Sequence, residues 1–161
     1  MPLRPGDTMP DATLLRMGEN GPEEVKLSER LKGRTVVLFG LPGAFTGTCT
    51  TAHVPSFINA MDGLKAKGVD EVICVAVNDP FVMQAWGDST GAHDAGITML
   101  ADPASDFTKA ADMAFTAPPV GFFDRSKRYA AVIRDGKVET VQEDEPGTCN
   151  MSGGDAILEA L

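Results

Sequence analysis

A single cysteine, Cys49, closes a loop with the sequence P-G-A-F-T-G-T-C, and its position favours chemistry at the sulfur. The loop follows a β-branched and aromatic run, Thr35 to Phe39, that is typical of a buried parallel strand. After Cys49, apolar residues spaced three and four apart predict an amphipathic helix that ends at Gly68; they are Val54, Phe57, Ile58, Met61 and Leu64. The first turn of a helix stabilises anions, so the pKa of a thiol there can fall well below about 8.5. Alternatively, Cys49 is a small apolar residue that fills a gap.

Two residues of the same loop could assist this sulfur. Thr46 stands where C-x-x-C redox motifs place their first cysteine, so no local dithiol is available. The Thr46 hydroxyl could donate a hydrogen bond to a thiolate or to an oxygen substrate held against it, or it could cap the helix. Pro42 restricts the loop and can shield the sulfur from water.

His53 lies four residues after Cys49, on the same face of the predicted helix. The pair suggests a Cys-His hydrolase or half of a metal site. A hydrolase needs an orienting Asn or Asp and an oxyanion hole, and a zinc site needs two more ligands. We therefore expect His53 to hydrogen-bond locally and support the pocket, with no metal ion and no cofactor. His93 lies in a polar stretch and is expected in an exposed loop.

Composition bounds the class of protein. The chain has 161 residues, of which 43% are hydrophobic and 23% charged, so we expect one globular domain over residues 1–161. A net charge of −9 argues against nucleic acid or an anionic membrane as partner. The longest apolar stretch, I-C-V-A-V, is too short to cross a bilayer and no secretory h-region is visible, so a cytoplasmic location is expected. Three cysteines without C-x-x-C favour reduced or reactive thiols.

An alternation of strands and helices must position these residues. The run Thr35–Phe39, the Cys49 helix and a second buried run, Glu71–Val77, predict a βαβ unit with parallel strands. Other predicted elements are a short edge strand within Leu3–Leu15, a helix over Phe81–Trp86, a strand Thr98–Ala101, a helix Asp106–Met113, hairpin strands Tyr129–Arg134 and Lys137–Gln142 around Asp135 and Gly136, and a last helix to Leu161 capped by Ser152 with Asp155. This is an α/β, thioredoxin-like plan, with a central mixed β-sheet flanked by helices.

The motif P-G-A-F-T-x-x-C, followed by H-V-P, resembles the active-site segment of the peroxiredoxins, in particular the type II or peroxiredoxin 5 subfamily. The similarity covers essentially the whole chain. It includes G-D-x-x-P-D-A-T-L near the N-terminus, V-N-D-P-F-V-M-Q-A-W-G at 77–87, L-A-D-P at 100–103, R-S-K-R-Y at 125–129 and the D-G hairpin. Gly47 stands where many relatives have proline, and F-F-D at 122–124 replaces a more glycine-rich segment. Both departures from the family pattern affect the stiffness of their loops.

The resemblance implies a thiol peroxidase that reduces hydrogen peroxide and alkyl hydroperoxides in antioxidant defence. The family signature falls on Pro42, Thr46 and Cys49, and Cys49 would become a sulfenic acid. The family's active-site arginine opens the first hairpin strand and matches Arg128, with Arg125 as the nearby competitor. Arg128 would stabilise the thiolate and hold the peroxide oxygens, although alone it would be taken for a surface ion pair. A homodimer is also implied.

The sequence leaves open how the sulfenic acid is reduced. Cys74 lies in I-C-V-A-V, where a strand buried on both faces would make it a core residue. Cys149 lies in the turn-rich segment P-G-T-C-N, where exposure and mobility are expected, so it is the candidate resolving cysteine. The resemblance allows such a disulfide, or direct reduction by glutathione with glutaredoxin or by thioredoxin.

Two other classes remain open at this point. A thioredoxin-like binding or holdase protein, in which Cys49 is incidental, predicts no peroxide turnover. A Cys-His acyl-transfer enzyme predicts ester or amide hydrolysis that is lost when His53 is replaced.

Overall fold

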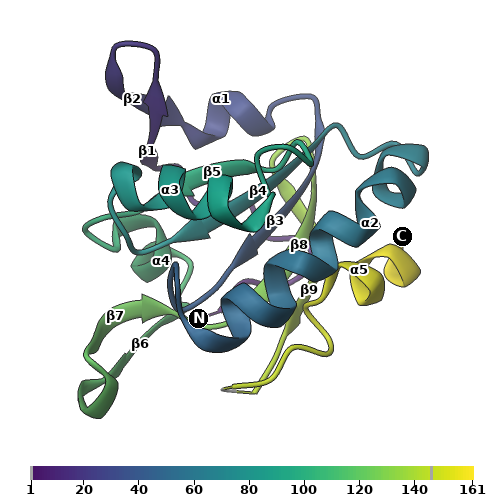
Figure 1. Ribbon diagram of the computed structural model, residues 1–161. Helices are drawn as coiled ribbons and strands as arrows, with labels where there is room; N and C mark the ends of the chain where they lie inside the picture. The colour runs from purple at the N-terminus through teal and green to yellow at the C-terminus, as the bar shows by residue number, and fades with distance from the viewer. Residues whose placement is uncertain (1, 146) are drawn as a thin grey trace.

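A seven-stranded sheet, ordered β2-β1-β5-β4-β3-β8-β9, forms the centre of the computed structural model, which describes residues 2–145 and 147–161 (Figure 1). Its strands are β1 (Thr13–Gly18), β2 (Gly21–Lys26), β3 (Thr35–Gly40), β4 (Glu71–Ala76), β5 (Thr98–Ala101), β8 (Tyr129–Arg134) and β9 (Lys137–Glu143). β4 runs parallel to both β3 and β5, and the remaining pairs are antiparallel. The predicted mixed sheet of the thioredoxin-like plan is confirmed.

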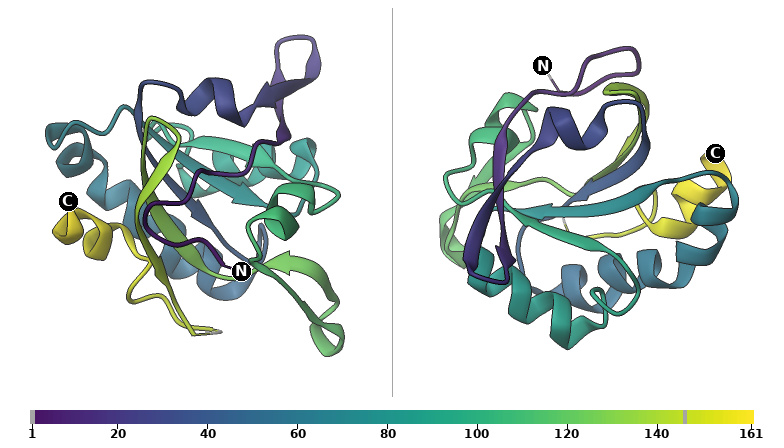
Figure 2. Two further views of the ribbon diagram at one scale, coloured as in Figure 1. Left: turned by 180° about the vertical axis from the view of Figure 1, so that it is seen from behind. Right: turned by 90° about the horizontal axis from the view of Figure 1, so that it is seen from above.

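Helices cover both faces of this sheet (Figure 2). On one face pack α2 (Val54–Ala66), α3 (Pro80–Thr90) and α5 (Gly154–Ala160), and on the other α1 (Leu27–Leu31) and α4 (Asp106–Ala110). Alternate residues of β3 feed the two cores, with Val37 and Phe39 on the first face and Val36 and Leu38 on the second. A strand covered on both sides must be apolar at every position. Among the described residues, no helix is long and apolar enough to span a membrane.

The predicted hairpin is present and brings the end of the chain back to β3. Asp135 and Gly136 have φ of 48° and 78°, the left-handed pair that a two-residue turn of type I′ requires. β8 therefore returns antiparallel to β3, with Tyr129 opposite Gly40. This register places the residue before β8, Arg128, beside the loop that leaves β3.

Several predicted element details are wrong. β1 is not an edge strand, because it lies between β2 and β5, and the polar segment after it forms the edge strand β2. The helix predicted over Asp106–Met113 ends at Ala110. Ser152 does not cap the last helix: Gly153 is the N-cap residue, without a side-chain hydrogen bond, and the Ser152 hydroxyl donates to Asp144 instead.

The sequence analysis also missed a small two-stranded sheet of β6 (Ala114–Ala117) and β7 (Phe122–Ser126). A short 3-10 turn, Pro118–Val120, joins the two strands. Both strands are brief and the two prolines between them interrupt any periodicity, so the pattern gave no strand signal. This arm projects from the body of the molecule (Figure 1).

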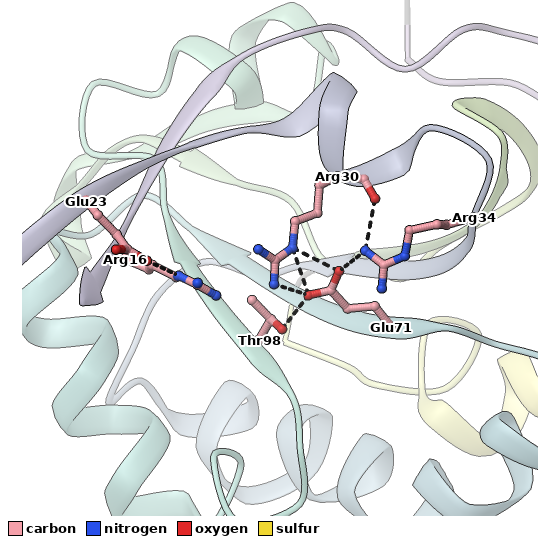
Figure 3. Close-up of polar contacts among 6 residues, drawn as sticks. All are labelled: Arg16, Glu23, Arg30, Arg34, Glu71 and Thr98. Carbon is pink, nitrogen blue, oxygen red and sulfur yellow. Dashed lines mark hydrogen bonds and ion pairs between the residues drawn. The ribbon is translucent and has the colours of Figure 1, made fainter. Parts of the chain in front are cut away.

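A cluster of ion pairs ties α1 to the start of β4 (Figure 3). Arg30 donates hydrogen bonds to the Glu71 carboxylate from Nε and from Nη2, the latter at 2.7 Å. Arg34 Nη1 donates to the same carboxylate at 2.9 Å. Thr98 on β5 adds a hydroxyl bond of 2.6 Å. Burial alone would raise the pKa of Glu71, but these donors and the two positive charges hold it below its ordinary value.

Candidate active site

The loop that leads from β3 to Cys49 is held by two neighbouring segments. The Ala44 N–H donates to Asn78 Oδ1, just beyond β4, at 2.9 Å. The Arg125 Nη1 of β7 donates to the Pro42 carbonyl at 3.0 Å. A Cβ at Gly43 would meet the Arg125 guanidinium, so a larger residue there would displace the end of this side chain. The loop is therefore fixed on both sides.

Cys49 opens a π-helical turn, Cys49–His53, that runs directly into α2. The Val54 N–H donates to the Cys49 carbonyl, five residues back. Such turns are rare and concentrate at functional sites. The predicted amphipathic helix is present as α2, but the apolar spacing does not reveal this wider first turn, which buries Cys49 and His53 together.

Arg128 holds the sulfur. Its Nη2 donates to Cys49 Sγ at 3.3 Å, and the residue is only 5% exposed. Within residues 2–145 and 147–161, no carboxylate forms an ion pair with Arg128. Its charge therefore acts on the sulfur without a competing anion in contact. The competitor Arg125 is bound to Pro42 and lies 5.2 Å above the ring centre of Phe122.

His53 is an uncharged link behind Arg128. Its Nε2 lies 3.0 Å from the Ser152 carbonyl, which can only accept, so Nε2 carries the proton. Nδ1 then accepts from Arg128 Nη1 at 3.0 Å. Burial, reinforced by the Arg128 charge, lowers the pKa of His53 to about 3. Both ring nitrogens are engaged elsewhere, so His53 cannot act as a base toward Cys49.

The Thr46 hydroxyl donates to the Gly43 carbonyl at 2.7 Å, and the Thr46 carbonyl accepts from the Thr50 N–H at 3.1 Å. The hydroxyl proton is thus directed to Gly43 rather than to the sulfur, and within the described residues no helix N–H donates to the hydroxyl oxygen, so Thr46 is not a side-chain cap. The oxygen keeps lone pairs that can accept a hydrogen bond. Thr46 is half-buried and lines the cavity described next.

A cavity of about 770 Å³ ends at this site. One wall comes from the active-site loop, with Pro42 and Thr46, and from Arg128, which directly precedes β8. The opposite wall is apolar and comes from the arm of β6 and β7, with Phe115, Ala117, Val120 and Phe122. Phe115 and Phe122 meet edge to face, with ring centres 6.0 Å apart. Phe122, one of the departures from the family pattern, therefore shapes the cavity.

One nitrogen of Arg128, the buried Nε, has no hydrogen-bond partner among the described residues. The buried Oε1 of Gln142 on β9 also lacks a partner within that part of the chain. A buried donor without a partner costs about 1–3 kcal/mol, so such groups occur where a ligand can satisfy them. Arg128 therefore keeps one donor without a partner in addition to the Nη2 that contacts the sulfur.

The other two cysteines differ in environment. Cys74 on β4 is fully buried, as predicted, and burial together with the neighbouring Cys49 raises the pKa of its thiol well above the ordinary value. Cys149 is half-buried rather than exposed, and its sulfur lies near Ser56 and Gly153. Burial raises the pKa of Cys149 as well. Pro146, the first residue of the P-G-T-C-N segment, lies outside the described residues.

His93 is exposed, as expected, and pairs with Asp88 at 2.7 Å. The sequence analysis missed the parts that Asn78, Asp144 and Ser152 play around the site. The contacts of Asn78 with Ala44 and of Ser152 with His53 join residues 34 and 99 positions apart, so no local pattern could reveal them. Asp144 contacts residues six to eight positions later in an irregular loop, a spacing that follows no helix or strand period.

A buried thiol at a strand-to-helix junction of a thioredoxin-like sheet, held by an unpaired arginine beside a cavity, defines a thiol-dependent redox protein. Comparison with known proteins narrows this class. A family model described as Redoxin matches residues 4–158. Peroxiredoxin-2C from Oryza sativa subsp. japonica is 42% identical, and the match covers 99% of both chains. Peroxiredoxin-2B from Arabidopsis thaliana is 39% identical with the same coverage.

Solved structures of peroxiredoxins are also similar to this chain. Reduced Prx3 from Vibrio vulnificus in complex with H2O2 has a TM-score of 0.92 and 42% identity, over 98% of each chain. Peroxiredoxin 5 from Alvinella pompejana has a TM-score of 0.86 and 32% identity, over 99% of this chain and 97% of that one. The chain therefore belongs to the redoxin family, as a peroxiredoxin of the type II or peroxiredoxin 5 subfamily. Its activity is that of an antioxidant thiol peroxidase, which leaves no place for the binding-only and acyl-transfer alternatives.

Proposed function

We propose that Cys49 is the sulfur that attacks the peroxide and that Arg128 activates it. The observation that carries this proposal is the contact of 3.3 Å between Arg128 Nη2 and Cys49 Sγ. A guanidinium without a carboxylate partner favours the anionic form of a sulfur in contact with it. The uncharged His53 supports the arginine without adding a second positive charge or neutralising the first.

The proposed step conserves atoms and electrons. The Cys49 thiolate attacks one oxygen of the hydroperoxide, so an S–O bond forms and the O–O bond breaks. The sulfur is oxidised to a sulfenic acid and the peroxide is reduced. The departing hydroxide or alkoxide takes up the proton that the thiol released and leaves as water or alcohol.

The remaining polar groups at the cavity end suit the peroxide oxygens. The Arg128 guanidinium, which lines the cavity and contacts the sulfur, can donate to the oxygen on which charge develops. The Thr46 oxygen can accept the hydrogen of the peroxide because its own proton is directed to Gly43. Pro42 closes the cavity beside them and limits access of water.

We propose that both hydrogen peroxide and alkyl hydroperoxides are substrates. The apolar wall of Phe115, Ala117, Val120 and Phe122 supports an organic substituent on the peroxide. Cumene hydroperoxide and hydrogen peroxide should both oxidise the enzyme. Phe122→Ser should slow oxidation by cumene hydroperoxide more than oxidation by hydrogen peroxide. Equal slowing would show that the apolar wall does not determine the preference between the two peroxides.

The decisive test is single-turnover oxidation of the reduced protein, read by mass spectrometry of quenched samples. Cys49→Ser should abolish the sulfenic acid, whereas Cys74→Ser should oxidise at nearly the wild-type rate, because Cys74 is buried in the sheet. Retained peroxide turnover by Cys49→Ser would refute the assignment of Cys49.

For the reducing half of the cycle we propose Cys149 as resolving cysteine, with thioredoxin, or glutathione with glutaredoxin, as external reductant. Cys149 lies in the loop before α5, and Thr48 at the start of the active-site helix donates to Gly147 of that loop at 3.2 Å. Wild type and Cys149→Ser are compared with thioredoxin, dithiothreitol, and glutathione plus glutaredoxin. Failure of the variant with thioredoxin supports resolution by Cys149; equal turnover refutes it and supports direct reduction of Cys49.

We also propose a homodimer. Four large apolar side chains are more than half exposed and lie on three segments, the active-site loop, α3 and the arm of β6 and β7: Phe45, Phe81, Val120 and Phe123. These segments are joined by the bonds from Ala44 to Asn78 and from Arg125 to Pro42. Large exposed apolar groups on hydrogen-bonded segments favour an interface. Light scattering should give the mass of a dimer, and Phe81→Glu should give a monomer; a monomeric wild type would refute the proposal.

A cytoplasmic location is likewise a proposal. It is supported by the three free cysteines, which suit a reducing compartment. Relatives named as chloroplastic, mitochondrial and peroxisomal forms show that location varies among similar proteins. Cell fractionation with an antibody to this chain tests it, and recovery in an organelle would refute it.

A further inference from the structure

Asp144, directly after β9, is a buried carboxylate with an unusual set of donors. It accepts hydrogen bonds from the N–H groups of Asn150, Met151 and Ser152 at 2.8–2.9 Å and from the Ser152 hydroxyl at 2.6 Å. Burial alone would raise the pKa of Asp144, but these hydrogen bonds lower it below its ordinary value. Because an ionised carboxylate only accepts, it suits four donors, whereas an amide would turn its own N–H groups toward some of them.

Hydrogen bonds connect Asp144 to the backbone of Arg128 and, through Ser152 and His53, to its guanidinium. Through the backbone, the Asp144 N–H donates to the Arg128 carbonyl at 3.0 Å, directly across the β8–β9 ladder. Through side chains, the bonds to Ser152 fix the carbonyl that accepts from His53 Nε2. His53 Nδ1 in turn accepts from Arg128 Nη1, while Nη2 reaches Cys49. The chain of contacts thus runs from Asp144 to the sulfur.

We propose that Asp144 is a positioning residue for peroxide reduction: by holding Ser152, it fixes the tautomer and orientation of His53, and through His53 it aims the Arg128 guanidinium at Cys49. The carboxylate stands behind a neutral imidazole rather than against the arginine. The guanidinium is therefore oriented without being neutralised by direct contact. The inference rests on the proposed role of Cys49.

A double-mutant cycle tests this relay. Asp144→Asn should slow single-turnover oxidation of Cys49 by hydrogen peroxide about 10- to 100-fold, by analogy with groups that orient metal-binding histidines, whose removal costs about that much. In the His53→Ala background, the same substitution should cost less than about twofold, because the link through which it acts is already absent. Thr148→Val removes a hydroxyl bond to Glu145 in the same loop and should leave the rate unchanged.

The outcomes separate the possible failures. An equal loss from Asp144→Asn in both backgrounds, or a wild-type rate with only lowered thermal stability, would overturn the relay. If Asp144→Asn does not fold, Ser152→Ala takes its place in the cycle, because it removes only the hydroxyl bond to the carboxylate; it should slow oxidation several-fold, and only when His53 is present. A wild-type protein that is not oxidised at Cys49 would refute the proposed function itself.

Discussion

Two arginine clusters in this molecule differ in what faces the guanidinium. Arg30 and Arg34 converge on the Glu71 carboxylate, so positive and negative charge lie in contact (Figure 3). Arg128 instead contacts a neutral imidazole and a thiol, and the nearest link to a carboxylate passes through His53 and Ser152. The first arrangement joins α1 to the sheet; the second keeps a positive charge directed at the sulfur.

The difference shows that burial of an arginine does not by itself indicate its role. Arg128 is more deeply buried than Arg30 or Arg34, yet it has no anion in contact and one nitrogen without a partner among the described residues. Leaving such a group uncompensated is costly, and a substrate can compensate it. A neutral second ligand such as His53 is therefore a better sign of a reactive arginine than burial.

The largest effect is expected from replacing the reactive arginine. Arg128→Ala should slow single-turnover oxidation of Cys49 by about 10²–10³-fold or more, because one side chain both favours the thiolate and donates to the developing charge. Arg128→Lys keeps the charge but lacks the planar fork of donors that contacts the sulfur and His53 at once, so it should recover only part of the rate. Rapid-quench measurement of the oxidised protein checks both variants.

The matched control is Arg30→Ala. It removes an arginine of the ion-pair cluster and should leave the oxidation rate within about twofold, since Arg30 acts on Glu71 alone. If both alanine variants slow oxidation equally, the distinction between the two clusters fails.

Removing the carboxylate at the centre of the first cluster should affect stability instead. Glu71→Gln leaves Arg30 and Arg34 facing each other and takes an acceptor from Thr98, so the free energy of unfolding should fall by about 1–3 kcal/mol. Urea denaturation followed by circular dichroism measures the loss. An unchanged midpoint together with slower Cys49 oxidation would reverse the roles assigned here.

The sequence predicted the parts of the site that depend on local pattern or on family motifs. The strand before Cys49, the helix after it and the Asp-Gly hairpin follow from short-range periodicity and turn chemistry, and the motif R-S-K-R-Y directed attention to Arg128. The role of Ser152 was assigned wrongly, because a serine before a helix looks like a cap whatever lies across the fold. Its actual partner is Asp144, eight positions earlier and directly after β9.

The pH dependence of stability distinguishes the neutral His53 from the charged partners of the other cluster. Unfolded chains take up a proton on histidine below about pH 6.5, whereas the pKa of His53 in the folded protein is about 3. The unfolded state binds more protons between these values, so stability should fall with falling pH by up to about 1.4 kcal/mol per pH unit. Denaturation in urea between about pH 6 and pH 5 measures this slope.

The variant His53→Gln supplies the control for that slope. Glutamine can donate to the Ser152 carbonyl and accept from Arg128, but it does not titrate. Its stability should depend less steeply on pH than that of the wild type. Identical slopes would mean that His53 is protonated in the folded protein, and the neutral link behind Arg128 would have to be abandoned.

The smallest effect is expected where arginine meets carboxylate in solvent. Arg16 and Glu23 face each other across β1 and β2 with Nε 2.6 Å from Oε1, but their side chains are 36% and 46% exposed (Figure 3). Water screens such a pair, so Glu23→Gln should cost between about 0 and 1 kcal/mol, and the cost should shrink further in about 1 M salt. Urea denaturation of Glu23→Gln beside Glu71→Gln compares the same chemistry at two depths. A loss as large as that at Glu71 would show that neither burial nor the number of partners determines what a carboxylate contributes to this fold.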